Sequence, residues 1–402
     1  MTDLVSFDDH REFIEEVEAF LRENLTSDLT RRQAATVSYF ADPGVSTEWQ
    51  QRLAIRGWGA PAWPKEYGGT GWSAAEQFIF ESLCANAGAP PQYPVGLRMI
   101  GPTLIEFGSV FQREYYLPRI IFGEDYWCQG FSEPGAGSDL ASLRTRAIKQ
   151  GDYYLVSGSK IWTTHAHVAN RMFALVRSSE NERRQDGITL LLIDMNQPGV
   201  SVEPICTIDG EQELNQVYLD SVRVPIHDRV GEEGAGWSHA KYLLEFERGA
   251  SIESPRLRKY LETVYELGRG CPYDELIGIA ERELNTSIAR IQIDLDAFEA
   301  LELSAIEARC AGGSPGPARS ALLKLRSTEI RQRISELSLR IVGSEILPDS
   351  VLGQEGQSNL ETLGGCAPRN WSRRYLSDRS HTIFGGTSEI QRDILARILL
   401  GY

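Results

Sequence analysis

One carboxylate lies where it could act as a base. The segment 237–250 has the spacing of a helix, and Glu247 falls on its apolar face, at i+7 from the first apolar residue. The other residues of this face are Ala240, Leu243 and Leu244. Burial raises the pKa of such a carboxylate toward the range that a general base needs. The alternative is a structural Glu247 paired with a basic side chain elsewhere. Glu245, by contrast, has Lys241 and Arg248 within helical reach and is predicted to be a solvated ion-pair residue.

A glycine- and serine-rich segment could hold a polar ring or a phosphate. It runs Cys128-Gln129-Gly130-Phe131-Ser132-Glu133-Pro134-Gly135-Ala136-Gly137-Ser138-Asp139. Gly135 and Gly137 lack side chains, so a ligand can approach the backbone, while Ser132 and Ser138 add hydroxyl and N–H groups. Glycine and serine are also the ordinary residues of turns, so a simple hairpin is an equal alternative.

Two later segments could contact a ligand as well. Trp162 and Thr164 are predicted to lie on one face of a strand, as an aromatic wall and a hydroxyl. Without other evidence, a tryptophan is more often buried for packing. Further on, Gly385-Gly386 precede a helix in which Ser388 and Gln391 have capping-box spacing. Such a helix N-terminus can bind an anion, or it can be a capped helix and no more.

The elements that position these residues fall into three parts. Apolar spacing predicts helices over 7–25, 47–57 and 73–123, with a loop at 58–71 that contains four glycines and two prolines. Short β-branched and aromatic runs predict strands between 127 and 228, and helical patterns return from about 237. We therefore predict an α+β protein with a helical part over 1–126, a β part over 127–228 and a helical bundle over 229–402.

Composition excludes several classes of partner. The 402 residues carry a net charge of −15, which disfavours nucleic acids and anionic membranes. No apolar run is long enough to span a membrane, and no His/Cys cluster has the spacing of a metal site. The six cysteines form no CxxC pair and are expected to be free, mostly buried thiols in a reducing compartment, which with the absence of a signal sequence predicts the cytoplasm. The nucleotide motifs GxGxxG and GxxxxGK[ST] are absent.

Taken in series, the three segments resemble the acyl-CoA dehydrogenase family. The first resembles its TEPxAGSD signature, the second its GxKxWxTN strand, and the third its YEGTxEIQR segment. The loop Trp63–Gly69 and Arg223-Val224-Pro225 also match, so the resemblance runs from about residue 50 to the end. Three signatures in order are far more specific than any one alone. Residues 127–146 and 160–167 are most similar to the large subunits of pimeloyl-CoA-type dehydrogenases.

This resemblance implies an FAD-dependent enzyme with the acyl-CoA dehydrogenase fold. In the family, a base removes the α-proton of an acyl-CoA thioester, the β-hydrogen leaves as a hydride to flavin N5, and a trans-2-enoyl-CoA results. The electrons then pass to an electron-transferring flavoprotein. By motif position, the expected cofactor-binding residues are Gln129, Phe131, Ser132, Gly137, Ser138, Trp162, Thr164, Gly386, Thr387 and Glu389.

The usual catalytic base is missing from its usual position. The family's Tyr-Glu-Gly-Thr is replaced by Phe384-Gly385-Gly386-Thr387, and glycine cannot remove a proton. Isovaleryl-CoA and long-chain acyl-CoA dehydrogenases carry Glu directly before Arg on the earlier helix, and Glu247-Arg248 is similar to this arrangement. We expect Glu247 to be the base, Arg248 to orient the Gly-Gly loop, and the N–H of Gly385 to polarise the thioester carbonyl. The vacated space predicts a branched or bulky acyl group.

A second departure predicts a heteromer. Family tetramers supply Arg-x-x-Phe-Gly and Gln-x-x-Gly-Gly motifs to the FAD of a neighbouring subunit. Here Phe-Gly is absent from 268–276, and Arg340 replaces the glutamine of the second motif. A heterotetramer with a sister subunit that completes the FAD site is the expected oligomer. The alternatives are a same-fold flavoenzyme, either an oxidase or one that acts on a carrier-protein-bound acyl group, a non-catalytic subunit, or an unrelated enzyme with similar turns.

Overall fold

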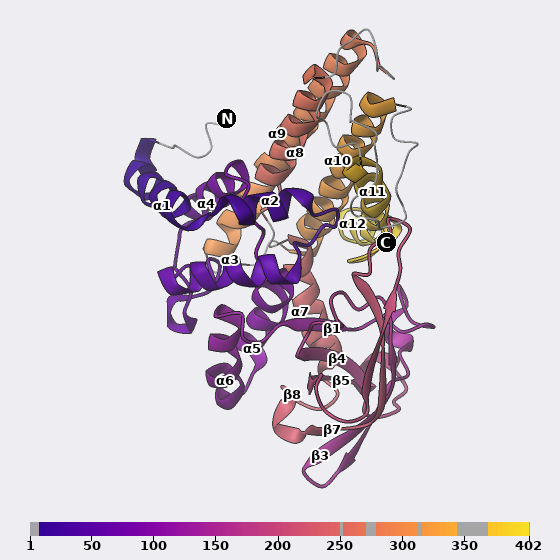
Figure 1. The fold of residues 1–402 in the computed structure, drawn as a ribbon. Coiled ribbons are helices and arrows are strands. Elements are labelled where there is room, and N and C mark those ends of the chain that lie inside the picture. Colours follow the sequence, from indigo (N-terminus) through magenta and orange to yellow (C-terminus); the bar gives the residue numbers. More distant parts are fainter. Residues whose placement is uncertain are drawn as a thin grey trace, which may run out of the picture.

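The computed structural model describes residues 8–249, 252–270, 279–311, 313, 316–343 and 369–401. Within these ranges the chain is first helical, then β, then helical again (Figure 1). The predicted α+β fold class and the order of its three parts are confirmed. No helix among the described residues is long and apolar enough to cross a membrane, and no cluster of metal ligands occurs among them.

The first helical part contains the loop at 58–71, between α3 and α4. Its helices are α1 (Arg11–Asn24), α2 (Ser27–Ala35), α3 (Pro43–Arg56), α4 (Ala74–Asn86), the π-helical η3 (Val95–Ile100), α5 (Gly101–Phe107) and α6 (Val110–Ile121). Capping fixes where several of these helices start: Ser73 is the N-cap of α4 and Ser109 is the N-cap of α6, each in a complete capping box. An added Cβ at Gly101 would lie 2.1 Å from the ring of Trp63, so only glycine lets the start of α5 approach the loop this closely.

A single mixed sheet forms the middle of the chain. Its strands are β1 (Trp127–Gly130), β2 (Arg146–Gln150), β3 (Tyr153–Lys160), β4 (Arg171–Arg177), β5 (Ile188–Asp194), β6 (Val200–Ile205), β7 (Leu214–Pro225) and β8 (Arg229–Val230). They are ordered β6-β7-β3-β2-β4-β5-β8, and β1 pairs in parallel with β4. Nearly every residue of β4 and β5 is buried, as expected of strands covered on both faces.

The second helical part packs on both the sheet and the first helices. It comprises α7 (Gly236–Gly249), α8 (Ser254–Gly270), α9 (Glu281–Cys310), α10 (Pro317–Val342), α11 (Arg369–Asp378) and α12 (Ser388–Leu400). Ile100 on η3, Leu190 on β5 and Leu243 on α7 are all fully buried in one core cluster. Each such aliphatic side chain contributes about 1.5–3 kcal/mol by burial, so packing determines where α7 lies. Figure 1 shows α7 between the sheet and the long helices.

The described cysteines are all free thiols. Cys84 and Cys128 are buried, whereas Cys206 and Cys310 are exposed. The expectation of mostly buried thiols therefore holds for only half of them. Cys271 and Cys366 lie outside the described residues.

Candidate active site

The glycine- and serine-rich segment is a tight turn with an open face. Glu133 and Ala136 exchange backbone hydrogen bonds of 3.0 and 2.9 Å, which closes the turn after β1. An added Cβ at Gly135 or Gly137 would meet nothing within 4 Å, and Ser138 is exposed. A ligand can therefore approach the backbone at Gly137 and Ser138 without displacing any described part of the chain.

The neighbouring residues of this segment differ in accessibility. Gln129 and Ser132 are half-buried, so part of each residue remains accessible. The ring of Phe131 is buried and meets Phe173 edge-on at 5.7 Å. Contact between Phe131 and a cofactor would therefore have to come from the backbone rather than from the ring.

A buried ion pair joins this segment to the next one. Lys160 Nζ lies 2.7 Å from Glu133 Oε1, and Lys160 also donates to the carbonyls of Phe131 and Leu175. Glu133 accepts backbone N–H groups from the two residues 144 and 145 as well. Burial alone would raise the pKa of Glu133, but the charge of Lys160 and these hydrogen bonds lower it. Burial lowers the pKa of Lys160 to about 8, although Glu133 opposes the shift.

The segment with Trp162 and Thr164 is a loop, so the predicted strand face is wrong. β3 ends at Lys160, and Trp162 has a φ of +61°. The backbone beyond β3 leaves the register of the β3–β7 ladder. The Ile161 N–H donates to the Ser132 carbonyl at 2.9 Å, and Thr163 exchanges backbone hydrogen bonds with Asn215 of β7. Trp162 is 55% exposed, which also excludes its assignment as core. A large aromatic side chain in a strained backbone conformation, facing outward, is typical of a binding surface.

A cluster of buried polar groups includes His165, which directly follows this loop. His165 is buried, has a φ of +55°, and its Nδ1 lies 2.8 Å from the Tyr126 hydroxyl. Its Nε2 lies 3.6 Å from Glu213. Burial lowers the pKa of His165 to about 4 and raises the pKa of Glu213 to about 7, although a hydrogen bond from Ser38 opposes the latter shift. Burial therefore favours the neutral form of both the imidazole of His165 and the carboxyl group of Glu213.

The Gly385-Gly386 loop precedes α12 in a conformation that favours glycine. The two residues have φ values of +63° and +87°. The side chain of Gln391 donates to both their carbonyls, at 3.2 and 3.1 Å. The predicted capping box at Ser388 is wrong, because Thr387 is the N-cap and accepts the N–H of Ile390. Gln391 is turned back to the loop instead, which ties the loop to the first turn of α12.

Glu389 lies in the first turn of α12, where a carboxylate interacts favourably with the helix dipole. Hydrogen bonds from the backbone and from Thr387 lower its pKa. The start of α12, where Thr387 is half-buried and Glu389 exposed, therefore offers both N–H donors and a charged acceptor to a ligand.

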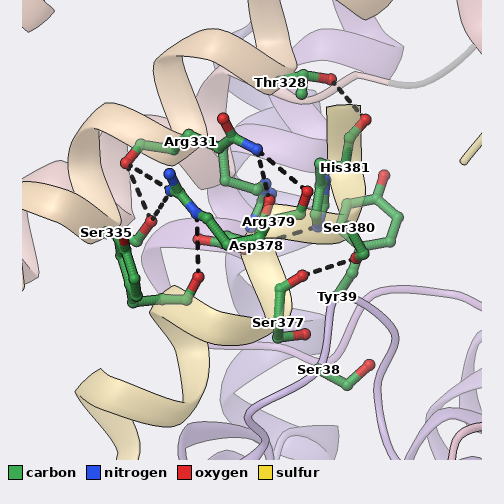
Figure 2. A network of polar contacts seen from close by, with 12 residues as sticks. Ser38, Tyr39, Thr328, Arg331, Ser335, Ser377, Asp378, Arg379, Ser380 and His381 are labelled. Carbon is green, nitrogen blue, oxygen red and sulfur yellow. Dashed lines mark hydrogen bonds and ion pairs between the residues drawn. The ribbon is translucent and has the colours of Figure 1, made fainter. Parts of the chain in front are cut away.

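Tyr39, from the first helical part, contacts the residues that precede the same loop. Tyr39 donates to Glu253 Oε1 at 2.7 Å, and the guanidinium of Arg331 lies over its ring at 5.0 Å. Figure 2 shows Tyr39 beside His381, whose ring it meets edge-on at 4.8 Å. Phe384, next to Gly385, packs against both rings. The loop is thus held in part by a residue more than 300 positions earlier in the chain, Tyr39.

Buried charges surround His381. Its Nε2 lies 3.6 Å from Asp378, and its carbonyl accepts a 2.5 Å hydrogen bond from Lys324 on α10. Burial and the nearby charge of Arg331 lower the pKa of His381 well below its ordinary value. Burial raises the pKa of Asp378, although the charge of Arg331 opposes this. Because α10 also packs on α7, it connects this loop to the helix that carries Glu247.

Glu247 and Arg248 lie in the last turn of α7. The side chains of α7 are described up to Phe246, so those of Glu247 and Arg248 lie outside the described part of the chain. Ala240 and Leu243 are buried, as predicted for the face that Glu247 continues. Of the motifs expected to complete a neighbour's cofactor site, residues 271–278 and 344 also lie outside the described ranges.

The described residues suit a flavin dinucleotide. The exposed Trp162 supplies an aromatic wall, the open backbone at Gly137 and Ser138 supplies close hydrogen-bonding groups, and the Thr387-capped helix supplies an N-terminus. Sequence reasoning missed the Glu133–Lys160 pair and the contacts of Tyr39. For Lys160 a signal was present: Tyr154 and Val156 are inward residues of β3, and alternation puts Lys160 on the same side.

Comparison with known proteins gives one consistent result. The descriptions "Acyl-CoA dehydrogenase, N-terminal domain", "middle domain" and "C-terminal domain" match residues 7–124, 128–222 and 234–400. The acyl-CoA dehydrogenase IpdE1 of Mycobacterium tuberculosis is 34% identical over 405 residues, which cover 98% of both chains.

Two solved structures are also similar over their whole length. A chain of the Tcur3481-Tcur3483 steroid ACAD is 28% identical, with a TM-score of 0.80 and coverage of 100% of this chain and 99% of that one. A chain of the ChsE4-ChsE5 complex of Mycobacterium tuberculosis is also 28% identical, with a TM-score of 0.78 and coverage of 98% and 97%. Both are complexes of two named subunits.

Proposed function

Because the chain belongs to the acyl-CoA dehydrogenase family and is an FAD-dependent oxidoreductase, we propose that it converts an acyl-CoA to a trans-2-enoyl-CoA with Glu247 as the base. Bound FAD would accept the β-hydrogen as a hydride. Everything else in the reaction is assigned to residues of this chain: Glu247 removes the α-proton, and the N–H of Gly385 polarises the thioester carbonyl.

The observation that carries this proposal is that the chain lacks a carboxylate at position 385 and has one at Glu247 instead. Position 385, where relatives carry the base, is a glycine at a φ of +63°. By helical spacing in the sequence, Glu247 follows Ala240 and Leu243, which are buried residues of α7. α10 packs on both α7 and the residues that hold the Gly385 loop, which supports a common site. Arg248 would then orient this loop.

The cofactor would lie between the open turn and α12. We assign its ring to Gln129, Phe131 and Ser132 and to the exposed side chain of Trp162 with Thr164. The remaining contacts are assigned to Gly137, Ser138, Gly386, Thr387 and Glu389. The domain boundaries proposed from the sequence, 1–126, 127–228 and 229–402, place this region where the middle and last parts meet.

The enzyme is proposed to work as a heteromer. Arg340 replaces the glutamine that relatives use in a neighbour's cofactor site, and it is engaged with Glu283 on α9 instead. The similarity to chains from two-subunit complexes supports a sister subunit. An electron-transferring flavoprotein is the proposed electron acceptor.

The test is anaerobic titration of the complex, co-expressed with its sister subunit, against a panel of acyl-CoA thioesters. Bleaching of the oxidised flavin absorbance is expected. Glu247→Gln should slow this reduction by at least about 10³-fold while FAD stays bound. Glu245→Gln, two residues away on another face of α7, is the matched control and should reduce normally.

Near-normal reduction in Glu247→Gln would overturn the choice of base. A bound flavin that no acyl-CoA reduces would instead favour a carrier-protein-bound substrate or an oxidase. Absence of flavin from the complex would favour a non-catalytic subunit.

A further inference from the structure

Backbone strain is concentrated around the loop that carries Trp162. Among the described residues only three other than glycine have a positive φ, and two of these are Trp162, at +61°, and His165, at +55°, directly after the loop. Such conformations cost free energy and persist only where surrounding contacts hold them. Trp162 is 55% exposed, so the packing of its own side chain does little to hold it. The direction of its indole ring therefore depends on what fixes the backbone on either side.

Buried side chains tie the loop down at both ends. Before Trp162, Lys160 is paired with Glu133 in the turn after β1. After it, His165 is 4% exposed, and its Nδ1 lies 2.8 Å from the hydroxyl of Tyr126, the residue that directly precedes β1. Both ties thus run to the stretch of chain that leads through β1 into the open turn.

The tie at His165 lies in an aromatic cluster. The His165 ring stacks on Tyr93 at 5.2 Å, and Tyr93 stacks on Tyr126 at 4.3 Å. Phe40 meets the His165 ring edge-on at 6.0 Å. The backbone of Tyr126 is fixed as well, since its N–H and its carbonyl are hydrogen-bonded to Asn170. Because both partners of the Tyr126–His165 hydrogen bond are held by other contacts, this bond can give the loop a fixed position.

The surroundings of His165 determine the direction of this hydrogen bond. Burial lowers the pKa of His165 to about 4, which favours the neutral ring with a single N–H. Its Nε2 lies 3.6 Å from Glu213, and a proton on Nε2 faces that carboxyl group. Nδ1 then accepts from the Tyr126 hydroxyl, whose pKa is raised by burial.

We propose that Tyr126 and His165 are positioning residues for the cofactor: their hydrogen bond holds the loop so that Trp162 presents its indole ring to the bound flavin. The inference rests on the proposed assignment of Trp162 to the flavin ring, and it adds the residues that act through Trp162. Neither Tyr126 nor His165 need touch the flavin. Their effect on the cofactor should therefore require the indole and disappear when the indole is absent.

The experiment measures FAD binding by the co-expressed complex after removal of its cofactor, in Tyr126→Phe, Trp162→Ala and the double variant. Tyr126→Phe removes one oxygen atom and keeps the aromatic cluster, so the protein should still fold. We expect its FAD dissociation constant to rise by about fivefold. The fluorescence of the bound flavin should rise as well, because stacking on an indole quenches it. In the Trp162→Ala background, Tyr126→Phe should cause no further change.

Further variants separate positioning from packing. Tyr154→Phe is the matched control, because it removes a hydroxyl that donates to Glu233 at 2.6 Å, at the opposite end of β3 from the loop. It should leave FAD binding unchanged. His165→Asn keeps a side-chain acceptor near the position of Nδ1 and tolerates a positive φ, so it should retain more FAD affinity than His165→Ala.

An FAD dissociation constant and a flavin fluorescence in Tyr126→Phe equal to those of the wild type would overturn the inference. So would effects of Tyr126→Phe and Trp162→Ala that simply add, or equal losses in His165→Asn and His165→Ala, since each result indicates packing alone. Unchanged FAD affinity in Trp162→Ala would instead remove Trp162 from the proposed cofactor site. None of these measurements needs an acyl-CoA, so a failure of the proposed reaction is distinguishable from a failure of this inference.

Discussion

Lys160 and Glu133 form an ion pair in which neither side chain has appreciable contact with solvent: the exposed fractions are 0% and 8%, and the two charged atoms lie 2.7 Å apart. The residues come from different sequence motifs, one in the turn after β1 and one at the end of β3. Their pairing therefore brings two segments of the proposed cofactor site to one place. Because the pair is satisfied by further hydrogen bonds to backbone groups, it holds the two segments in one geometry.

Lys160→Met should destabilise the protein strongly, because it leaves the carboxylate of Glu133 buried without its cation. We expect a loss of about 3–5 kcal/mol in the free energy of unfolding, measured by urea denaturation. The exposed pair of Arg397 and Asp393 on α12 is the control, and Arg397→Met should change stability little. Equal effects of the two substitutions would contradict a structural role for the buried pair.

Trp162→Ala should weaken cofactor binding without unfolding the protein. The side chain is 55% exposed and its backbone is strained, so we expect less than about 1 kcal/mol of change in the stability of the apoprotein. The FAD dissociation constant should rise by at least about tenfold with loss of the stacking surface. Phe173→Ala, at a fully buried position, should instead cost about 3–5 kcal/mol. Unchanged FAD affinity in Trp162→Ala would remove Trp162 from the site.

Gln391→Leu should slow catalysis more than it weakens substrate binding. The substitution removes both donors that hold the carbonyls of Gly385 and Gly386, so the N–H proposed to polarise the thioester loses its fixed position. We expect kcat for flavin reduction to fall by about 10- to 100-fold, with KM nearly unchanged. Gln197→Leu removes a comparable bond to a backbone carbonyl in the turn after β5 and serves as the control. A rate equal to that of the wild type would show that Gln391 does not position the loop.

Glu213 should make stability depend on pH. Burial raises its pKa from 4.5 to about 7 in the folded chain, so the folded state binds the proton more tightly than the unfolded state. The stabilising contribution is therefore complete below pH 4.5 and is lost as the pH rises toward about 7. Glu213→Gln cannot titrate, so the difference in unfolding free energy between wild type and variant should shift in favour of the variant across this range. A difference that does not vary with pH would contradict the raised pKa.

The sequence alone determined the features that depend on neighbouring residues. Apolar spacing of 3.6 residues marked α1, α3 and α7, because one face of each helix packs on the core. Short β-branched and aromatic runs marked β3, β4 and β5, of which β4 and β5 are buried on both faces. The three motifs in order indicated the family, and the glycine at 385 showed that the usual base is absent. These conclusions need only the order of residues along the chain.

Tertiary structure decided what depends on residues far apart. Trp162 leaves the predicted strand because its neighbour Thr163 pairs with Asn215 of β7, 52 positions later, and not with Leu214, which the β3–β7 register would place opposite it. Thr387, not Ser388, caps α12, since the side chain of Gln391 is used by the Gly385 loop. Tyr39 reaches His381, and Glu133 reaches Lys160, through packing of separate parts of the chain. Periodicity specifies which face of an element is buried, but only packing specifies which distant side chain it meets.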